Sequence, residues 1–311
     1  IEDKGIDAAY FWERLYYVDF AGEYETAREN TPVDLLTSGV FGAHYVNTVS
    51  PTFLKEIVEG KHEIVFPALR TELKNKLDAG CADGILNAPD PSYNPTTDTA
   101  LVRTYGPSDQ KEGKLHNKLV LQKMTGLTQD PHAALFFWPS RLDRIQKGCQ
   151  LLAEILFHVV STYWKQNLQI IFVANGDFRV HFTHIVQFHN LYKRVSICDF
   201  SEQLSRIAYA GSDYLLMPSL FEPCGLPQMI GPIYGSLPVA HDTGGIHDTV
   251  EHLDWKKNAG NGFLFKTYDS GGLYWAMSQA MEFHSQCVRA KNAQIKRIMQ
   301  ESLDRFNHAV S

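Results

Sequence analysis

Cysteine is scarce in this sequence, and the few cysteines lie far apart. The 311-residue chain has five, and no two of them form a Cys-x-x-Cys pair. This spacing excludes a disulfide scaffold and a zinc site built on cysteines, and it favours free thiols in a reducing compartment. No apolar run reaches the roughly 18–20 residues that span a bilayer, so we expect no membrane partner. The charged start, residues 1–4, is unlike a secretory signal, and we expect the chain to begin inside an ordered region.

An excess of positive charge is also absent. Lysine and arginine number 29 against 35 aspartates and glutamates, which gives a net charge of −6. A general nucleic-acid binder carries the opposite sign, so we expect no nucleic-acid partner. The hydrophobic fraction of 44% and the aromatic fraction of 12% exclude a largely disordered chain. They predict a globular protein of one or two domains.

Several well-known site motifs are missing. There is no Gly-x-x-x-x-Gly-Lys-Ser/Thr loop, no complete dinucleotide fingerprint and no Gly-x-Ser-x-Gly elbow. Histidines occur in two groups, but neither group has a known metal-ligand spacing such as His-Glu-x-x-His. We therefore expect no metal, and we interpret these side chains as packed or solvated histidines. The groups are His181, His184 and His189, and His241, His247 and His252.

Short apolar strands alternate with helices from residue 135 onward. The pattern is clearest over 147–165, where apolar residues follow one stripe at helical spacing. Such alternation is typical of βαβ units and predicts an α/β fold with a parallel sheet covered on both faces. We predict strands over 135–138, 169–174, 195–198, 214–217 and 237–240, and further helices over 178–191, over 202–210 and after Gly225.

The chain before this alternation is organised differently. A proline-rich stretch over 89–95 cannot continue a sheet or a helix, and we place the domain boundary there, with domains 1–87 and 88–311. Ser50 or Thr52 is expected to cap a helix that begins near Phe53. We further predict strands over 44–49 and 84–87, a helix over 68–79, and a polar helical region over 1–40 with an aromatic cluster at Tyr10, Phe11, Trp12, Tyr16 and Tyr17.

Two of the loops that follow strands carry charged side chains. Ligands of parallel sheets sit at the carboxyl ends of strands, so these loops are the candidate site. In the loop 140–148, Arg141 and Lys147 could clamp a phosphate, or they could be ordinary solvated charges. In the loop 219–228, Glu222 could accept hydrogen bonds from hydroxyl groups, or it could simply cap the next helix.

Two more strand-end loops contain glycine. The loop 242–246 holds Gly244 and Gly245, which allow close contact with a ligand or form a tight turn. The loop 175–177 is interpreted as a turn. Cys224 has no histidine close to it in the sequence, and we interpret it as a small buried thiol or a backbone contact point rather than a nucleophile. The basic residues near the carboxyl end are read as a solvated helix face.

At this point the motifs resemble the bacterial glycogen synthase and plant starch synthase family. The strongest matches are Phe221-Glu222-Pro223-Cys224-Gly225-Leu226, Tyr234-Gly235-Ser236-Leu237-Pro238-Val239 and Thr243-Gly244-Gly245-Ile246-His247-Asp248-Thr249-Val250. Supporting matches are Ser140-Arg141-Leu142, Gln146-Lys147-Gly148, Thr48-Val49-Ser50-Pro51 and Gly84-Ile85-Leu86-Asn87-Ala88-Pro89-Asp90. They occur in the family's order over roughly residues 34–300.

The resemblance implies a glycosyltransferase of the GT-B type, with a cleft between two Rossmann-like lobes. This chain would hold the last part of the first, acceptor-side lobe and a nearly complete second lobe that binds the nucleotide sugar. The implied reaction transfers glucose from ADP-glucose to the non-reducing end of an α-1,4-glucan, with retention at the anomeric carbon and without a cofactor. The implied location is the cytoplasm, or the plastid for a plant protein.

The resemblance also implies roles for single residues. Arg141 and Lys147 would hold the diphosphate and stabilise the leaving ADP, because fixed cations stabilise the negative charge that develops there. Glu222 would bind glucose hydroxyls. The remaining implied contacts to the nucleotide sugar come from the backbone of Cys224, Gly225 and Leu226 and from the loop residues Thr243, Gly244 and Gly245.

The sequence also departs from the family pattern. The Lys-x-Gly-Gly-Leu loop and the His-Asn segment of the first lobe are absent, and we expect the chain, which stops at residues 308–311, to end before the helix that returns to the first lobe. The Arg141-to-Lys147 spacing is one residue longer than usual, and Pro227 replaces a threonine and removes one N–H. We expect nucleotide binding with weak transfer. Two other interpretations stay open: a non-catalytic remnant that binds glucan or a protein, and a retaining transferase that uses another nucleotide sugar.

Overall fold

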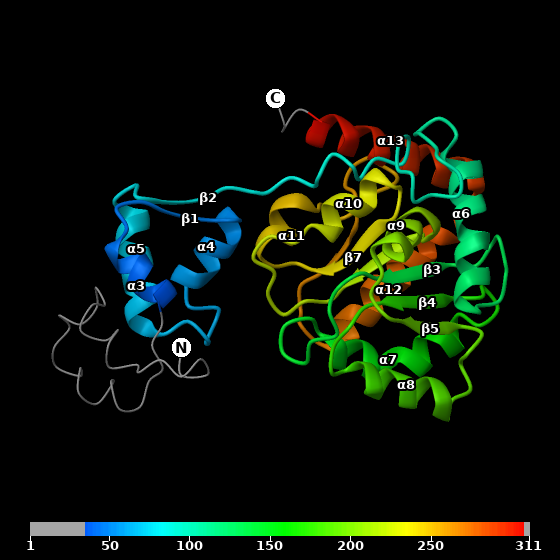
Figure 1. Ribbon diagram of the computed structural model, residues 1–311, viewed down its shortest axis with the longest axis horizontal. Coiled ribbons are helices and arrows are strands. Elements are labelled where there is room, and N and C mark those ends of the chain that lie inside the picture. The colour runs from blue at the N-terminus through cyan, green and yellow to red at the C-terminus, as the bar shows by residue number, and fades with distance from the viewer. Residues whose placement is uncertain (1–34, 308–311) are drawn as a thin grey trace. The chain divides into compact units, whose positions relative to one another are not determined.

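The chain divides into two compact units, Ile1–Leu86 and Asn87–Ser311, in the computed structural model (Figure 1). The structure describes residues 35–307. The predicted aromatic cluster at Tyr10–Tyr17 and the chain end at 308–311 lie outside the described residues. Within residues 35–307, no helix is both long enough and apolar enough to cross a membrane.

The first unit is a small α/β layer with a core of its own. Ser50 caps α4 by accepting a hydrogen bond from Phe53 N at 2.9 Å, as one of the two predicted caps. Its two strands pair in parallel, with Val46 opposite Ala82. The core holds Leu54, Ile57, Leu73 and Ala82. The elements are α3 Leu35–Gly42, β1 Val46–Thr48, α4 Pro51–Val58, α5 Pro67–Asp78 and β2 Ala82–Gly84.

The strand predicted over 84–87 is therefore wrong in its bounds: it begins two residues and ends three residues after the observed β2. Pairing with β1 ends at the Thr48–Gly84 partners, so the apolar residues that suggested a strand lie beyond it. Ile85 is 57% exposed, which shows that its side chain joins no core.

The second unit contains a six-stranded sheet in which all neighbouring strands are parallel, as the sequence predicted. The strand order is β5-β4-β3-β6-β7-β8. The chain therefore runs outward from β3 to one edge, returns to the centre at β6, and runs outward to the other edge. The strands are β3 Leu135–Trp138, β4 Gln169–Val173, β5 Val195–Cys198, β6 Tyr214–Met217, β7 Leu237–His241 and β8 Phe263–Phe265.

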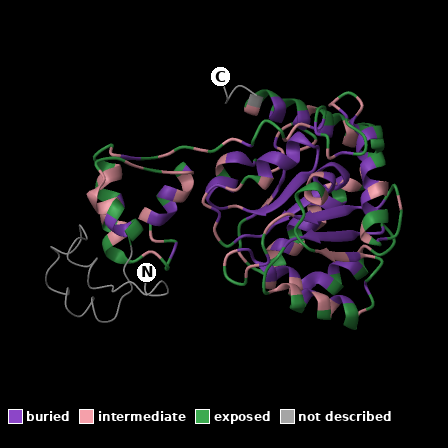
Figure 2. Cartoon of the chain, in the orientation of Figure 1, coloured by how far each residue is buried: buried purple, intermediate pink, exposed green. Residues whose placement is uncertain are grey.

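Helices cover both faces of this sheet, and the inner strands β3, β4, β6 and β7 are buried (Figure 2). Phe136 and Trp138 point to one apolar cluster, and Leu135 and Phe137 point to the other, as the two-residue period of a strand requires. The first cluster is completed by α7 Cys149–Thr162, α8 Arg179–Phe188 and α12 Ser270–His284, and the second by α6 Gln110–Thr125, α9 Glu202–Gly211, α10 Pro227–Ile233 and α13 Val288–Asn307. A short helix, α11 Gly244–Thr249, follows β7.

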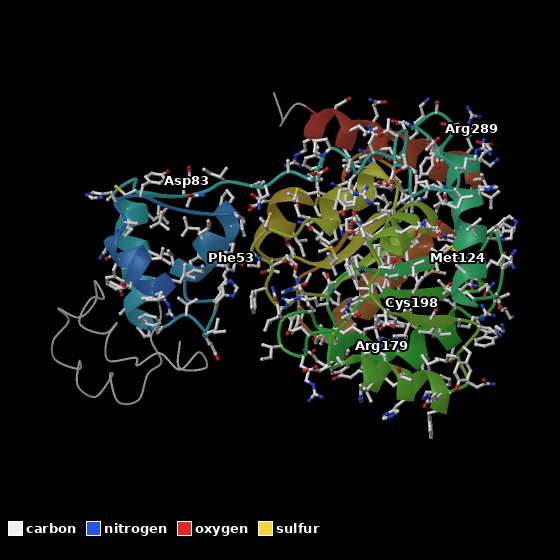
Figure 3. The ribbon with its side chains drawn as sticks, viewed as in Figure 1. Phe53, Asp83, Met124, Arg179, Cys198 and Arg289 are labelled. Carbon is white, nitrogen blue, oxygen red and sulfur yellow. The ribbon has the colours of Figure 1, made fainter. Side chains whose placement is uncertain are left out.

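The basic residues near the carboxyl end are only partly a solvated face, so that interpretation needs correction. Arg289, at the start of α13, projects from the surface (Figure 3). Lys291 instead donates to His284 O at 3.0 Å, and Arg297 donates to Gly260 O at 2.7 Å. These two side chains tie α13 to the preceding helix and loop.

Candidate functional site

The loops that follow β3 and β6 meet at the centre of the sheet. These two strands are neighbours, yet the chain leaves them toward opposite edges, which is the position where open α/β sheets bind ligands. Gln146 joins the two loops: its carbonyl accepts from Leu220 N at 2.8 Å, and its Nε2 donates to Phe221 O at 3.3 Å.

Gly148 makes this close approach possible. A Cβ atom at this position would lie 1.9 Å from Pro218 O, and the backbone has a φ of +67°. Any other residue would therefore both collide with the neighbouring loop and strain the backbone. The glycine begins α7 and brings the preceding Lys147 against the loop that follows β6.

Lys147 and Glu222 form a buried ion pair across the two loops. Lys147 Nζ lies 2.7 Å from Glu222 Oε2, and the two side chains are 11% and 8% exposed. Ser219 Oγ donates to the same Oε2 at 3.0 Å. Among the residues that the structure describes, none donates a hydrogen bond to Oε1 of Glu222. The sequence placed both residues at strand ends but did not predict that they pair.

The alternative in which Glu222 caps the following helix does not hold. Leu226 occupies the N-cap position of α10, and no side chain caps that end. The backbone carbonyl of Glu222 instead accepts a hydrogen bond from Gly245 N at 2.8 Å. Glu222 thus contacts the loop after β3 through its side chain and the loop after β7 through its backbone.

The glycine loop after β7 packs directly against the loop after β6. A Cβ atom on Gly245 would lie 2.0 Å from Cys224 O, so the missing side chain serves an internal contact. Gln228 fastens the same two loops: its Nε2 donates to Cys224 O at 2.7 Å, to Gly225 O at 3.0 Å and to Thr249 Oγ1 at 3.2 Å. Thr243 and Gly244 begin α11 beside this contact.

Arg141 lies apart from the buried pair. It is exposed, whereas its neighbour Leu142 is fully buried and donates its N–H to Asn175 O at 2.9 Å. The loop 175–177, interpreted as a turn, thus anchors the loop that carries Arg141 and Lys147. Asp143 turns that loop by accepting from Gln146 N at 2.7 Å, and this hydrogen bond lowers the pKa of Asp143.

The thiol of Cys224 is buried, as expected from the sequence. Burial raises its pKa above the ordinary value, so the neutral thiol predominates at neutral pH. A thiolate nucleophile is therefore disfavoured at this position.

The two histidine groups serve packing and hydrogen bonding. His241 is buried, and its Nδ1 lies 2.8 Å from Ser219 O, so it supports the loop that carries Glu222. His189 stacks on Phe157 with ring centroids 3.9 Å apart. Across residues 35–307, no group of three or more histidine, cysteine, aspartate or glutamate side chains could hold a metal ion.

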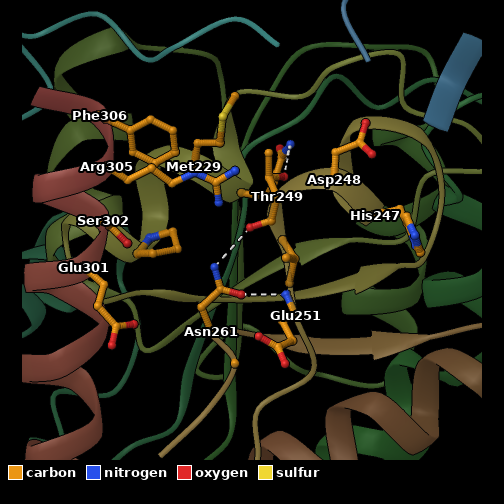
Figure 4. Close-up of a pocket in the computed structure, with 14 residues that line it drawn as sticks. Met229, His247, Asp248, Thr249, Glu251, Asn261, Glu301, Ser302, Arg305 and Phe306 are labelled. Carbon is orange, nitrogen blue, oxygen red and sulfur yellow. Dashed lines mark hydrogen bonds between the residues drawn. The ribbon is translucent and has the colours of Figure 1, made fainter. Parts of the chain in front are cut away.

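A separate cavity of about 340 Å³ lies between α10, α11 and α13 (Figure 4). Asn261 spans its wall by donating to Thr249 O at 3.1 Å and accepting from Glu251 N at 2.8 Å. None of the residues predicted for the site lines it.

Sequence reasoning missed four side chains that shape the site: Gln146, Ser219, Gln228 and His241. Each is an ordinary polar residue in or beside a loop, and its importance depends on a contact with a loop distant in the chain. Gln146 was visible only as part of the segment that contains Lys147, and His241 was considered only as a metal ligand.

Comparison with known proteins gives consistent matches. Residues 133–282 match the family described as "Glycosyl transferases group 1". The chain is 35% identical over 254 residues to the glycogen synthase of Mycoplasma mobile, which covers 81% of this chain and 51% of that protein. It is 34% identical over 269 residues to the glycogen synthase of Bacillus subtilis, covering 85% and 53%. The chain thus spans about half the length of these relatives.

Solved structures agree on the fold. The catalytic domain of starch synthase IV from Arabidopsis thaliana, bound to ADP and acarbose, superposes with a TM-score of 0.73 at 28% identity, covering 88% of this chain and 56% of that one. Anabaena Alr3699/HepE, in complex with UDP and glucose, gives a TM-score of 0.57 at 18% identity, covering 86% and 61%. The second match shows the GT-B-like fold alone.

Proposed function

Because the chain carries a group 1 glycosyltransferase domain and is related to glycogen and starch synthases, we propose that it transfers glucose from ADP-glucose to the non-reducing end of an α-1,4-glucan with retention of configuration. The observation that carries this proposal is the buried Lys147–Glu222 pair where β3 and β6 diverge. Residues 88–311 form the donor-binding lobe, and the preceding residues belong to the acceptor-side lobe.

The two charges of the pair suit the two ends of a nucleotide sugar. Lys147 offers an ammonium group to the diphosphate, and the exposed guanidinium of Arg141 can move onto the same anion as a bidentate donor. Both cations stabilise the charge that builds on ADP as it leaves. Glu222 Oε1 accepts from glucose hydroxyls while Oε2 stays bound to Lys147 and Ser219.

The loops around the pair complete the donor site. The backbone of Cys224, Gly225 and Leu226 contacts the sugar and the phosphate, and Thr243, Gly244 and Gly245 form the opposite wall. Leu226 is 40% exposed, and Pro227 begins α10 without an N–H of its own. Retention by attack on the face of the departing ADP needs no enzyme nucleophile, in agreement with the raised pKa of the Cys224 thiol.

Arg141 gives the cleanest test, because it is exposed and its removal leaves no buried charge. We expect Arg141→Gln to weaken binding of ADP-glucose about 10- to 100-fold, since a hydrogen bond to a charged group contributes about 1.5–3 kcal/mol. The matched control is Arg144→Gln, an exposed arginine of the same loop, which should bind like the wild type. Calorimetric titration measures both, with UDP-glucose as the competing donor.

The role of Lys147 is tested by replacing it together with Glu222. Removing it alone strands a buried carboxylate and costs about 3–5 kcal/mol of stability, so loss of binding could reflect unfolding. The double variant Lys147→Met/Glu222→Gln removes both charges and should fold, yet it should neither bind ADP-glucose nor extend glycogen. Tighter binding of UDP-glucose by the wild type would contradict the assigned donor. Glycogen binding with no binding of either donor would favour the non-catalytic remnant.

A further inference from the structure

A second cavity of the larger unit lies at the carboxyl ends of β7 and β8. Its volume is about 620 Å³, within the range of roughly 300–1,000 Å³ that is usual for ligand clefts. Asp242 directly follows β7, and Lys266 directly follows β8. The cavity therefore opens on the same edge of the sheet as the candidate donor site. Its lining consists of Asp242, His247, Val250, Glu251, His252, Leu264, Lys266 and Trp275.

Trp275 supplies a flat aromatic wall. The side chain comes from α12 and is 48% exposed, although its neighbour Ala276 is fully buried. The imidazole of His252 stacks on the indole, with centroids 5.6 Å apart and planes at 21°. Leu264 N donates to His252 Nδ1 at 3.1 Å, so this imidazole is held in place. His252 thus supports one face of the Trp275 indole.

Polar groups of both kinds surround this wall. Asp242 Oδ1 and His247 Nδ1 lie 2.7 Å apart, and the side chain of His247 is 56% exposed. Glu251 and Lys266 are exposed at the rim. Carboxylates accept hydrogen bonds from hydroxyl groups, and ammonium and imidazole groups donate them. An aromatic face with such a rim suits a neutral ligand that has an apolar ring face and many hydroxyl groups.

The cavity adjoins the candidate donor site along the chain, through the loop that begins at Asp242. In this loop, Gly245 packs closely against Cys224 and donates its N–H to Glu222 O at 2.8 Å. We propose that this cavity is a binding subsite for an α-1,4-glucan chain, with Trp275 stacking on the apolar face of a glucose unit. The choice of a glucan as occupant rests on the proposed function, because a polymeric acceptor extends beyond the point of transfer.

The test compares two exposed tryptophans. Trp275→Ala should weaken binding of maltoheptaose at least about tenfold in calorimetry and abolish retardation in gels that contain glycogen, since the stacking surface is lost. Trp164→Ala is the matched control, because Trp164 is 49% exposed but stands beyond the end of α7 against Arg194. Trp275→Phe keeps an aromatic face and should restore most of the binding, which excludes misfolding as the cause.

A parallel titration with ADP-glucose separates this proposal from the proposed function. Trp275→Ala should leave ADP-glucose binding unchanged. Equal glucan binding by Trp275→Ala and the wild type, or no glucan binding by the wild type, overturns the subsite. Weaker ADP-glucose binding with unchanged glucan binding also overturns it, and assigns the cavity to the nucleotide. Loss of glucan binding in Trp275→Ala, in a protein that binds no ADP-glucose, supports the subsite and contradicts the transferase.

Discussion

At the residue scale, the buried pair Lys147–Glu222 at the candidate site costs folding free energy. Taking two charges out of water costs several kcal/mol per ion, and good geometry recovers only part of it. The pair is nevertheless held from several sides: Ser219 donates to Glu222, His241 supports Ser219, and Gly148 allows the two loops to meet. Such support keeps both charged groups oriented before a ligand binds, which is the arrangement that electrostatic catalysis requires.

Gln228 links the loops after β6 and β7 at the candidate site. Gln228 is 1% exposed, and replacing it with leucine would remove the side-chain donor from the buried carbonyl of Cys224 and from the half-buried carbonyl of Gly225. Each unsatisfied buried group costs about 1–3 kcal/mol, so Gln228→Leu should lower the free energy of unfolding by about 2–4 kcal/mol. Urea unfolding measures this loss.

The matched control for Gln228→Leu is Gln300→Leu. Gln300 is exposed on α13 and bonds only to Asp304 of the same helix turn among the described residues. Its replacement should change the urea midpoint little. A wild-type midpoint for Gln228→Leu would show that the two loops are held together by other contacts.

At the element scale, α6 explains why part of the fold escapes sequence reasoning. The helix packs against α9 and buries five polar side chains: Gln110, Lys114, Asn117, Lys118 and Gln122. Lys114 Nζ donates to three carbonyls, of Ala210, Ser212 and Tyr234, at the ends of α9 and α10, and burial lowers its pKa to about 7. A search for apolar stripes does not detect a helix whose inner face is polar.

Asp213 makes the packing of α6 sensitive to acid. Burial by itself would raise the pKa of Asp213, but Lys118 Nζ at 2.6 Å lowers it to about 2 from an ordinary 3.8. A carboxyl with a depressed folded-state pKa stabilises the fold above its unfolded pKa. This stabilisation, about 2 kcal/mol, is lost as the pH falls from about 4 to 2. Urea midpoints measured across this window should therefore fall in the wild type.

Asp213→Asn should flatten that acid dependence. The variant is less stable than the wild type at pH 6, and the difference between the two should shrink below pH 3. Asp304→Asn, an exposed change on α13, is the control and should follow the wild type throughout. Parallel acid profiles for Asp213→Asn and the wild type would contradict the role of the Lys118–Asp213 pair.

At the scale of the whole molecule, the two units have separate hydrophobic cores. One contains Leu54 and Leu73, and the clusters on the two sheet faces contain Phe136 and Phe137. Among residues 35–86 of the first unit, the core is small, and small cores provide little margin of stability. The two units are therefore expected to open independently.

Leu54→Ala tests this independence. Leu54 is 2% exposed, and truncating a buried leucine costs about 2–5 kcal/mol. Hydrogen–deuterium exchange should then rise in peptides from 46–84 and stay unchanged in peptides from 135–241. Increased exchange in the sheet of the larger unit would show that the two units unfold cooperatively.

The sequence by itself determined the helices and strands that depend on residues close together in the chain. Apolar runs such as 135–138 and 214–217 are strands because both their faces are buried, and Ser50 begins a helix because its hydroxyl accepts from the first turn. It also determined which loops end those strands, and so which residues to consider for a site. The resemblance of the motifs predicted that the chain is related to glycogen and starch synthases and has the GT-B-like fold.

Only the tertiary structure decided which of those loops touch. Lys147 and Glu222 are 75 residues apart in the chain, and their pairing depends on the strand order that makes β3 and β6 neighbours. Three elements, α6, β8 and α12, were not predicted. Of these, α12 does carry an apolar stripe at helical spacing, from Leu273 to Met281, so the sequence contained a signal for it that sequence reasoning missed. For α6, the buried polar side chains find their partners on elements distant in sequence. Hydrogen bonds and ion pairs between distant residues leave no periodic trace in a sequence, whereas burial of a continuous face does.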